Sequence, residues 1–148
     1  MADVARSRTV IAAPRQEVMA AIADFPAYPE WAGSFRSVEV IEPGPDGRAR
    51  QVRFVLEAGF IRDKFELLYD WDADTRQSWT LAKPTAVLSA VTGSYLLADH
   101  GLGTDVTYEL NINLRIPMLG IIKRRAVNMI IDQALKGLKK YVENLGDA

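Results

Sequence analysis

Apolar and polar residues alternate through three stretches of the chain. Almost every second side chain is apolar in residues 52–58, 65–71 and 106–114, and the neighbours between them are mostly polar or charged. Successive side chains of a β-strand point to opposite faces of its sheet, so this pattern indicates strands with one buried and one exposed face. The core of the protein is therefore expected on one side of a sheet.

Other stretches alternate less cleanly but are rich in the β-branched and aromatic residues that favour strands. They are residues 4–11, 37–42, a short segment around Trp79 and Leu81, and residues 87–98. Short segments rich in turn-forming residues join successive strands, which predicts an antiparallel meander. These connections are residues 43–47, 59–61 and 99–103.

Two short helices are expected near the N-terminus. Pro14 suits a first helical turn, and Val18 and Ile22 then share one face of a short helix. Residues 25–31 contain two prolines three positions apart, which prevent a long helix but allow one compact turn.

The longest helical pattern follows Pro117 and runs from Met118 to Leu145. Its apolar residues recur with a period of about 3.6 residues, as expected for a helix that buries one face. The apolar stripe consists of Val127, Ile130, Ala134, Leu138 and Tyr141, and the opposite side carries Arg125, Asn128, Asp132, Lys136, Lys139 and Glu143.

Together these elements predict an α+β fold in the order β-α-α-β6-α, formed as a single domain from residues 1–148. The dry face of the sheet must be covered, and only the C-terminal helix is long enough to cover it. We therefore expect a curved seven-stranded antiparallel sheet around the long C-terminal helix, with the two short helices closing one end.

Composition and charge exclude several classes of function. The chain has a net charge of −1, which gives no overall attraction to phosphates, so we expect no nucleic-acid partner. It has one histidine and no cysteine, so we expect neither a disulfide nor a transition-metal site, and no cofactor motif is visible. No signal peptide or membrane-spanning run is visible, and we expect a cytoplasmic protein.

The inward positions of the predicted sheet and helix are mostly large, aromatic and apolar, with a few hydroxyl and amide groups. Such a lining suits a cavity for a hydrophobic molecule with one or two polar groups. A solid core without a cavity is the alternative that the pattern leaves open. The predicted cavity residues are Trp31, Phe54, Leu56, Phe65, Tyr69, Trp71, Trp79, Tyr95, Tyr108, Leu110, Ile122, Ala126, Met129, Ile130 and Gln133.

Four segments, in register over nearly the whole chain, resemble one family. They are Ile11-Ala12-Ala13-Pro14 with Val18, the segment Tyr28-Pro29-Glu30-Trp31, the segment Gly101-Leu102-Gly103-Thr104-Asp105-Val106-Thr107-Tyr108, and the long helix. In these features the chain resembles the polyketide cyclase/dehydrase and lipid-transport branch of the START-like (SRPBCC) superfamily. The resemblance implies a helix-grip fold, in which the sheet wraps around the last helix and encloses a deep cavity for lipids, sterols, polyketides or other hydrophobic ligands.

Residues suited to acid–base catalysis are scarce on the inward face. His100 lies in a glycine-rich turn. The strand carboxylates take the outward positions, with the exception of Asp63, whose position in the alternation is inward. The inward Tyr69, Tyr95 and Tyr108 are weak catalytic candidates, because a buried phenol more often satisfies a hydrogen bond than transfers a proton.

Three hypotheses on function follow. The first is a non-catalytic carrier or sensor of a hydrophobic small molecule. The second is a metal-free cyclase or dehydratase of the polyketide aromatase/cyclase type, in which the inward tyrosines polarise a carbonyl. The third is a protein-interaction module, as the coenzyme-Q-binding relatives in this superfamily suggest.

One surface segment suggests contact with a membrane. Met118 to Arg125 joins an apolar stretch to three consecutive basic residues, a pattern suited to a lipid headgroup region, and residues 59–62 are a second candidate contact. Burial of the apolar stretch against the sheet is the alternative. Within the helix, the turns from Ile122 through Met129 are expected to line the cavity near its mouth.

Overall fold

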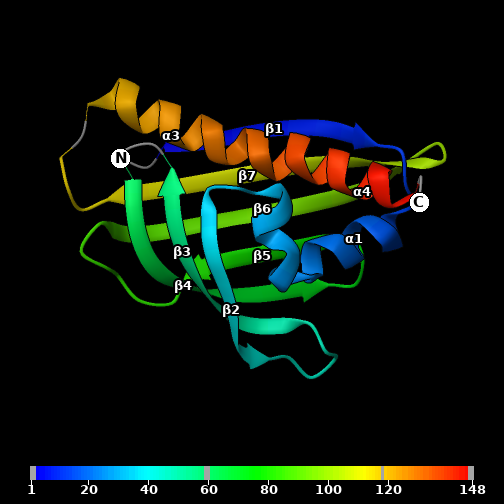
Figure 1. Cartoon of the computed structure of the whole chain (residues 1–148), viewed down its shortest axis with the longest axis horizontal. Helices are drawn as coiled ribbons and strands as arrows, with labels where there is room; N and C mark the ends of the chain where they lie inside the picture. Colours follow the sequence, from blue (N-terminus) through cyan, green and yellow to red (C-terminus); the bar gives the residue numbers. More distant parts are fainter. Residues whose placement is uncertain (1–2, 59–60, 118, 147–148) are drawn as a thin grey trace.

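The computed structural model describes residues 3–58, 61–117 and 119–146. Its seven-stranded sheet has the order β1-β7-β6-β5-β4-β3-β2, and every neighbouring pair is antiparallel. The sheet therefore begins and ends with β1 and β2 as its edges (Figure 1). The strands are β1 (Asp3–Ile11), β2 (Phe35–Pro43), β3 (Ala49–Ala58), β4 (Ile61–Asp72), β5 (Arg76–Leu81), β6 (Leu88–His100) and β7 (Gly103–Leu114).

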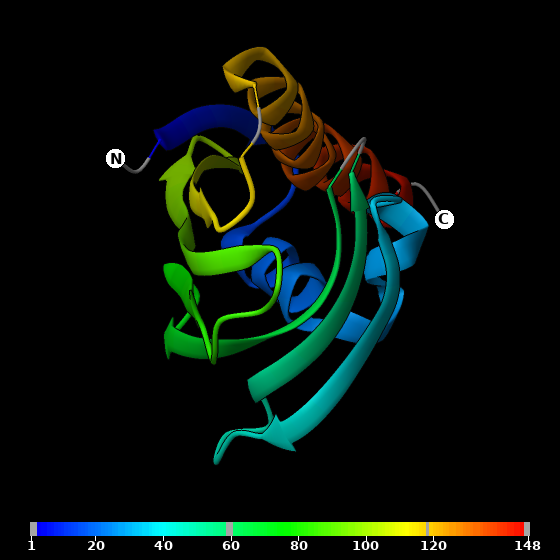
Figure 2. The same ribbon diagram turned by 90° about the vertical axis from the view of Figure 1, so that its left-hand side faces the viewer.

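The helical elements cover the concave side of this sheet. Figure 2 shows the sheet curling around the interior while the C-terminal helix crosses the gap between its two edges. The predicted helix-grip architecture is confirmed, although residue 118 and the predicted hairpin residues 59 and 60 lie outside the described part of the chain. The helices are α1 (Arg15–Ala23), η1 (Phe25–Ala27), α2 (Tyr28–Trp31), α3 (Gly120–Asp132), η2 (Gln133–Gly137) and α4 (Leu138–Gly146).

The long C-terminal helix is not the regular α-helix that its sequence predicts, because η2 is a π-helical segment. A π turn holds one residue more than an α turn, so it shifts the phase of every position that follows. Val127 and Leu138 are buried as predicted, whereas Tyr141 is only half-buried and the neighbouring Val142 takes the buried position.

Close approach between η2 and α2 depends on Gly137. A Cβ atom at this position would overlap the main-chain carbonyl of Trp31. Only glycine therefore lets the helix approach α2 at this distance.

Two side chains predicted to face solvent instead connect α4 to the end of β1. Lys139 donates a hydrogen bond to the Val10 carbonyl at 2.7 Å, and Glu143 accepts one from the Ala12 N–H at 2.8 Å. The two side chains also bond each other at 2.7 Å, and this hydrogen bond is the main reason that the pKa of Glu143 is lowered. Both side chains lie beside β1 because the chain leaves that strand directly beneath α4.

The outer face of the sheet carries ion pairs, as the alternation predicts. Asp105 pairs with Arg8 at 2.6 Å, Glu66 with Arg53 at 3.1 Å and Asp70 with Arg76 at 3.0 Å. Glu57 and Glu109 pair in the same way with Arg36 and Arg6. None of these carboxylates is thus on the concave face.

We predict that Gly137→Ala destabilises the protein by at least about 1 kcal/mol, because the backbone overlap exceeds the gain of up to about 1 kcal/mol in helix propensity. Urea unfolding followed by circular dichroism measures the change. Gly120→Ala is the matched control, since nothing lies within 4 Å of its added Cβ. Equal stability of the two variants would contradict the role given to Gly137.

Candidate functional site

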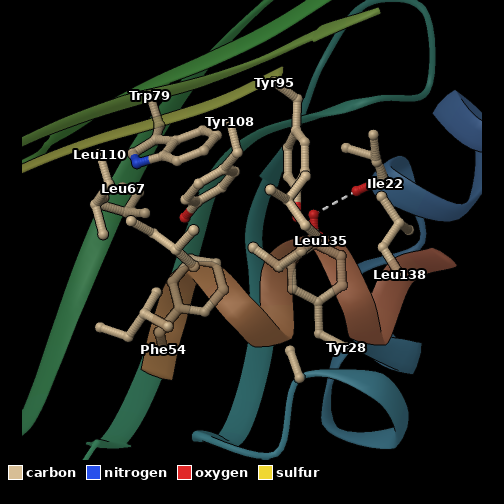
Figure 3. Close-up of a cluster of buried hydrophobic side chains, with 14 of the residues drawn as sticks. Ile22, Tyr28, Phe54, Leu67, Trp79, Tyr95, Tyr108, Leu110, Leu135 and Leu138 are labelled. Atoms are coloured by element: carbon tan, nitrogen blue, oxygen red, sulfur yellow. Dashed lines mark hydrogen bonds between the residues drawn. The ribbon is translucent and has the colours of Figure 1, made fainter. Parts of the chain in front are cut away.

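A cavity of about 60 Å³ lies between the concave face of the sheet and the C-terminal helix. Its walls come from strands β2 to β7, from α2 and the loop after it, and from the junction of α3 with η2. Figure 3 shows Trp79, Tyr95 and Tyr108 extending from the sheet toward the helix. No Asp, Glu, Lys, Arg or His is among the described lining residues, so the cavity is uncharged as well as largely apolar.

Most of the predicted cavity residues converge on this space. They come from five strands, from α2 and from the C-terminal helix, which are far apart in the sequence. The predicted residues that line the cavity are Trp31, Leu56, Phe65, Tyr69, Trp79, Tyr95, Tyr108, Leu110, Ile130 and Gln133.

Phe54 and Trp71 do not line the cavity, which corrects the prediction from strand parity. Phe54 is fully buried and stacks on Phe65 at 5.6 Å between ring centroids, so it is core packing behind the wall. Trp71 is half-buried near the end of β4, where its indole N–H donates to the Ala49 carbonyl at 2.8 Å and Arg48 lies over its ring.

The prediction for the first turns of the helix is also wrong. Ile122, Ala126 and Met129 do not line the cavity, and Met129 is 41% exposed. α3 contacts β1, β3 and β7 over these turns, and the helix faces the cavity only from Ile130 onward. The π segment brings this later part of the helix over the aromatic wall.

An aromatic layer forms the sheet side of the cavity. The ring of Trp79 lies 6.0 Å from Tyr69, 5.9 Å from Tyr95 and 5.5 Å from Tyr108, centroid to centroid. Trp79 faces Gly93 across the β5–β6 pair, and a Cβ at Gly93 would overlap the indole. The missing side chain thus provides the space in which the indole lies.

Sequence reasoning missed two polar residues of the lining, Gln77 and Ser34. Gln77 lies two positions before Trp79 on β5 and pairs with Tyr95 on β6, so the same alternation that selects those aromatics places its amide on the concave face. Ser34 in the loop after α2 gave no such periodic signal.

Several buried polar atoms of the lining have no hydrogen-bond partner among the described residues. They are both amide atoms of Gln77, the hydroxyl of Ser34 and the indole nitrogen of Trp31. Gln77 is only 1% exposed, and leaving a buried polar group unpaired costs about 1–3 kcal/mol. Burial raises the pKa of the Tyr28 phenol and the nearby Gln77 amide acts in the opposite direction, but the two side chains are not in regular hydrogen-bond geometry.

The tyrosine hydroxyls fall into two groups. Tyr95 donates to the Ala134 carbonyl in η2 at 2.8 Å, and Tyr28 donates to the Ile22 carbonyl. The hydroxyls of Tyr69 and Tyr108 make no hydrogen bond with the described residues.

Burial raises the pKa of all four of these phenols. They are therefore neutral at physiological pH, where they can donate hydrogen bonds but are poor general bases.

The cavity comes nearest to solvent beside Phe35 and Gln133, the two lining residues that are only half-buried. The side-chain oxygen of Gln133 accepts a hydrogen bond from the Ser34 N–H at 2.8 Å, which joins the helix to the loop before β2. This contact closes the cavity on that side.

The remaining candidates lie away from the cavity. His100 is exposed at the end of β6, and Asp63 accepts a hydrogen bond from the Thr85 hydroxyl. Across the described residues, no group of three or more His, Cys, Asp or Glu side chains is arranged to hold a metal ion.

The described part of the predicted membrane-contact segment is exposed except at Ile122 and Lys123, which are half-buried. Leu119 is 69% and Ile121 58% exposed, so the alternative of burial against the sheet is wrong for these two side chains. Met118 lies outside the described residues, and contact with a lipid surface stays a prediction. No described helix is long and apolar enough to cross a bilayer.

Fold and cavity together define a helix-grip protein of the START-like superfamily. The model of the family described as polyketide cyclase / dehydrase and lipid transport matches residues 1–143, and the chain belongs to this family. Membership supports the binding of a hydrophobic ligand or a cyclase-type role. A search of curated proteins finds no match.

Solved structures share the fold over almost the entire chain. A START superfamily protein from Mycobacterium smegmatis has a TM-score of 0.85 at 19% identity, covering 96% of this chain and 98% of that one. A protein from Thermus thermophilus has a TM-score of 0.79 at 21% identity, covering 97% and 99%. The Zhui aromatase/cyclase from a Streptomyces species has a TM-score of 0.79 at 14% identity, covering 97% and 94%.

We predict that the four buried tyrosines resist ionisation in the folded protein, because burial raises the pKa values of Tyr28, Tyr69, Tyr95 and Tyr108 above the ordinary 10.0; the pKa of the half-buried Tyr141 is raised as well. The unfolded chain ionises freely, so this contribution to stability is complete below about pH 10 and is lost as the pH rises further. Phenolate absorbance during an alkaline titration, with circular dichroism in parallel, measures both effects.

Tyr69→Phe is the control for this titration and should remove one late-ionising phenol. If all five tyrosines ionised near pH 10 while the circular dichroism stayed native, the buried positions given to them would be wrong.

Proposed function

We propose that this protein is a non-catalytic carrier or sensor that holds a hydrophobic small molecule between the sheet and the C-terminal helix. The observation that carries the proposal is a cavity with aromatic and aliphatic walls, a few polar groups and no charged residue among the described lining. Apolar walls with a small number of polar groups are typical of small-molecule sites. The absence of an ionisable pair in the lining favours binding over acid–base chemistry.

The size of the cavity limits what enters without rearrangement. Its 60 Å³ is well below the roughly 300–1,000 Å³ of ordinary small-molecule pockets. In this conformation it admits a small fragment or a few water molecules, so a lipid-sized ligand must push side chains apart. The half-buried Phe35 and the bond from Ser34 to Gln133 mark the place where the walls open most easily.

Val91→Ala tests this proposal, because Val91 lines the cavity and its truncation enlarges it. We expect the variant to bind the neutral fluorescent probe N-phenyl-1-naphthylamine several-fold more tightly than the unaltered protein, as the probe is larger than the cavity. Both fluorescence titration and native mass spectrometry of the purified protein report occupancy.

Val106→Ala is the matched control, since Val106 is completely buried but is not part of the lining. Each substitution is expected to cost about 1–3 kcal/mol of stability, so stability alone cannot separate them. A protein that is empty after purification, with no probe binding in any of the three forms, would rule out the proposal.

Cyclase-type catalysis is the second candidate, and the hydroxyls of Tyr69 and Tyr108 favour it. Both phenols line the cavity, both have a raised pKa and neither is committed to a hydrogen bond with the described residues. A neutral phenol in this position can donate a hydrogen bond to a ligand carbonyl and polarise it.

If the protein cyclises a poly-β-ketone substrate, Tyr108→Phe should lower kcat by about 10–1,000-fold while the affinity for the substrate changes little. Single-turnover kinetics with the protein in excess over the substrate, at several protein concentrations, separates the two effects. Tyr95→Phe serves for comparison, because that hydroxyl is already bonded to Ala134. Equal turnover in Tyr69→Phe, Tyr108→Phe and the unaltered protein would reject catalysis by these phenols.

A further inference from the structure

Gln77 is the least exposed polar side chain of the described cavity lining, and its amide presents a donor nitrogen and an acceptor oxygen side by side. It is 1% exposed, and neither its nitrogen nor its oxygen has a hydrogen-bond partner among the described residues. Buried polar atoms in folded proteins are nearly always paired, so an unpaired amide beside a cavity calls for an explanation.

The neighbours of Gln77 do not supply this pairing. Across the strands it faces Trp71 on β4 and Tyr95 on β6, whose polar atoms bond the carbonyls of Ala49 and Ala134. The Tyr28 hydroxyl nearby donates to the carbonyl of Ile22. These three neighbours thus donate their hydrogen atoms elsewhere, which leaves the cavity as the source of a donor for the Gln77 oxygen and of a further acceptor for its nitrogen.

We propose that Gln77 recognises the polar group of the ligand, and that this ligand is a neutral, mostly apolar molecule with a carbonyl and an adjacent N–H or O–H donor. A carboxamide is the simplest such group. The inference rests on the proposed function, since it names the class of molecule that the same cavity takes.

The chemistry of the lining supports each part of this description. The Gln77 nitrogen donates and so pairs with a carbonyl oxygen, while the Gln77 oxygen accepts and so pairs with a ligand N–H or O–H. Trp31 and Ser34 add unpaired polar atoms that can donate. A charged ligand is disfavoured, because no basic or acidic lining residue compensates the loss of its hydration.

A site of this kind discriminates strongly between similar molecules. An apolar analogue of the same shape leaves both amide atoms of Gln77 unpaired, and a site built to bond a polar group rejects such an analogue far more than an apolar wall does. Gln77 is therefore a specificity-determining residue in this proposal, with no part in catalysis.

The test uses four probes of matched size: benzamide, acetophenone, α-methylstyrene and benzoate. They share a phenyl ring and present, in turn, a carbonyl with a donor, a carbonyl alone, no polar group and a charge. NMR titrations that follow the indole N–H resonances give each dissociation constant. Binding in the cavity should shift the resonances of Trp31 and Trp79, which line it, more than that of Trp71, which does not.

We expect the affinity of benzamide relative to α-methylstyrene to fall at least about tenfold in Gln77→Met, which keeps the side-chain length and removes both polar atoms. The relative affinity of acetophenone should fall less in this variant. Benzoate should bind the unaltered protein at least about tenfold more weakly than benzamide. Gln51→Met is the matched control, since Gln51 bonds Glu66 on the outer face and should leave all ratios within twofold.

Melting temperature separates recognition from support of the fold. Gln77→Met should melt at the same temperature as the unaltered protein or higher, because it removes an unpaired buried group. A clear fall in its melting temperature would show that the amide supports the fold, and would overturn the inference.

The binding results separate the two proposals. If α-methylstyrene and benzamide both bind and their ratio is the same in Gln77→Met, the inference is wrong and the proposed function stands. If none of the four probes binds the unaltered protein, both are wrong.

Discussion

The close approach of the C-terminal helix to the sheet and to α2 is the constraint on which the rest of the structure depends. Gly137 lets the π segment reach the Trp31 carbonyl, and the hydroxyl of Tyr95 bonds the Ala134 carbonyl in the same segment. Gln133, at its start, bonds the Ser34 N–H. The π segment is therefore where the helix, the sheet and the loop before β2 meet, and π turns are frequent at functional sites.

This packing also explains the electrostatic properties of the cavity. The ion pairs of the sheet are on its outer face, and the described lining of the cavity has only neutral polar groups. Burial raises the pKa values of the tyrosines and keeps them neutral, while the amide of Gln77 stays unpaired. Such an interior favours an uncharged ligand and makes hydrogen-bond donation, rather than proton abstraction, its available chemistry.

Strand alternation predicted most of the cavity wall because a residue's face in a sheet depends on its position along the strand alone. Tyr69, Trp79 and Tyr108 were predicted in this way. The same alternation places Gln77 on the inward face, but Gln77 was not predicted because it is polar. Alternation does not say how far along a strand the cavity extends. Phe54 shares the correct face and is nevertheless covered by other rings.

The sequence by itself determined the order of the elements, the inward face of the three strands that alternate cleanly and the family, because these follow from local periodicity and from motifs in register. Only the tertiary structure decided which part of the helix faces the cavity and which buried polar atoms lack partners. Those properties arise where Gly137 meets Trp31 and where Ala134 meets Tyr95. Such contacts join residues far apart in the chain, and no local pattern encodes the distance between them.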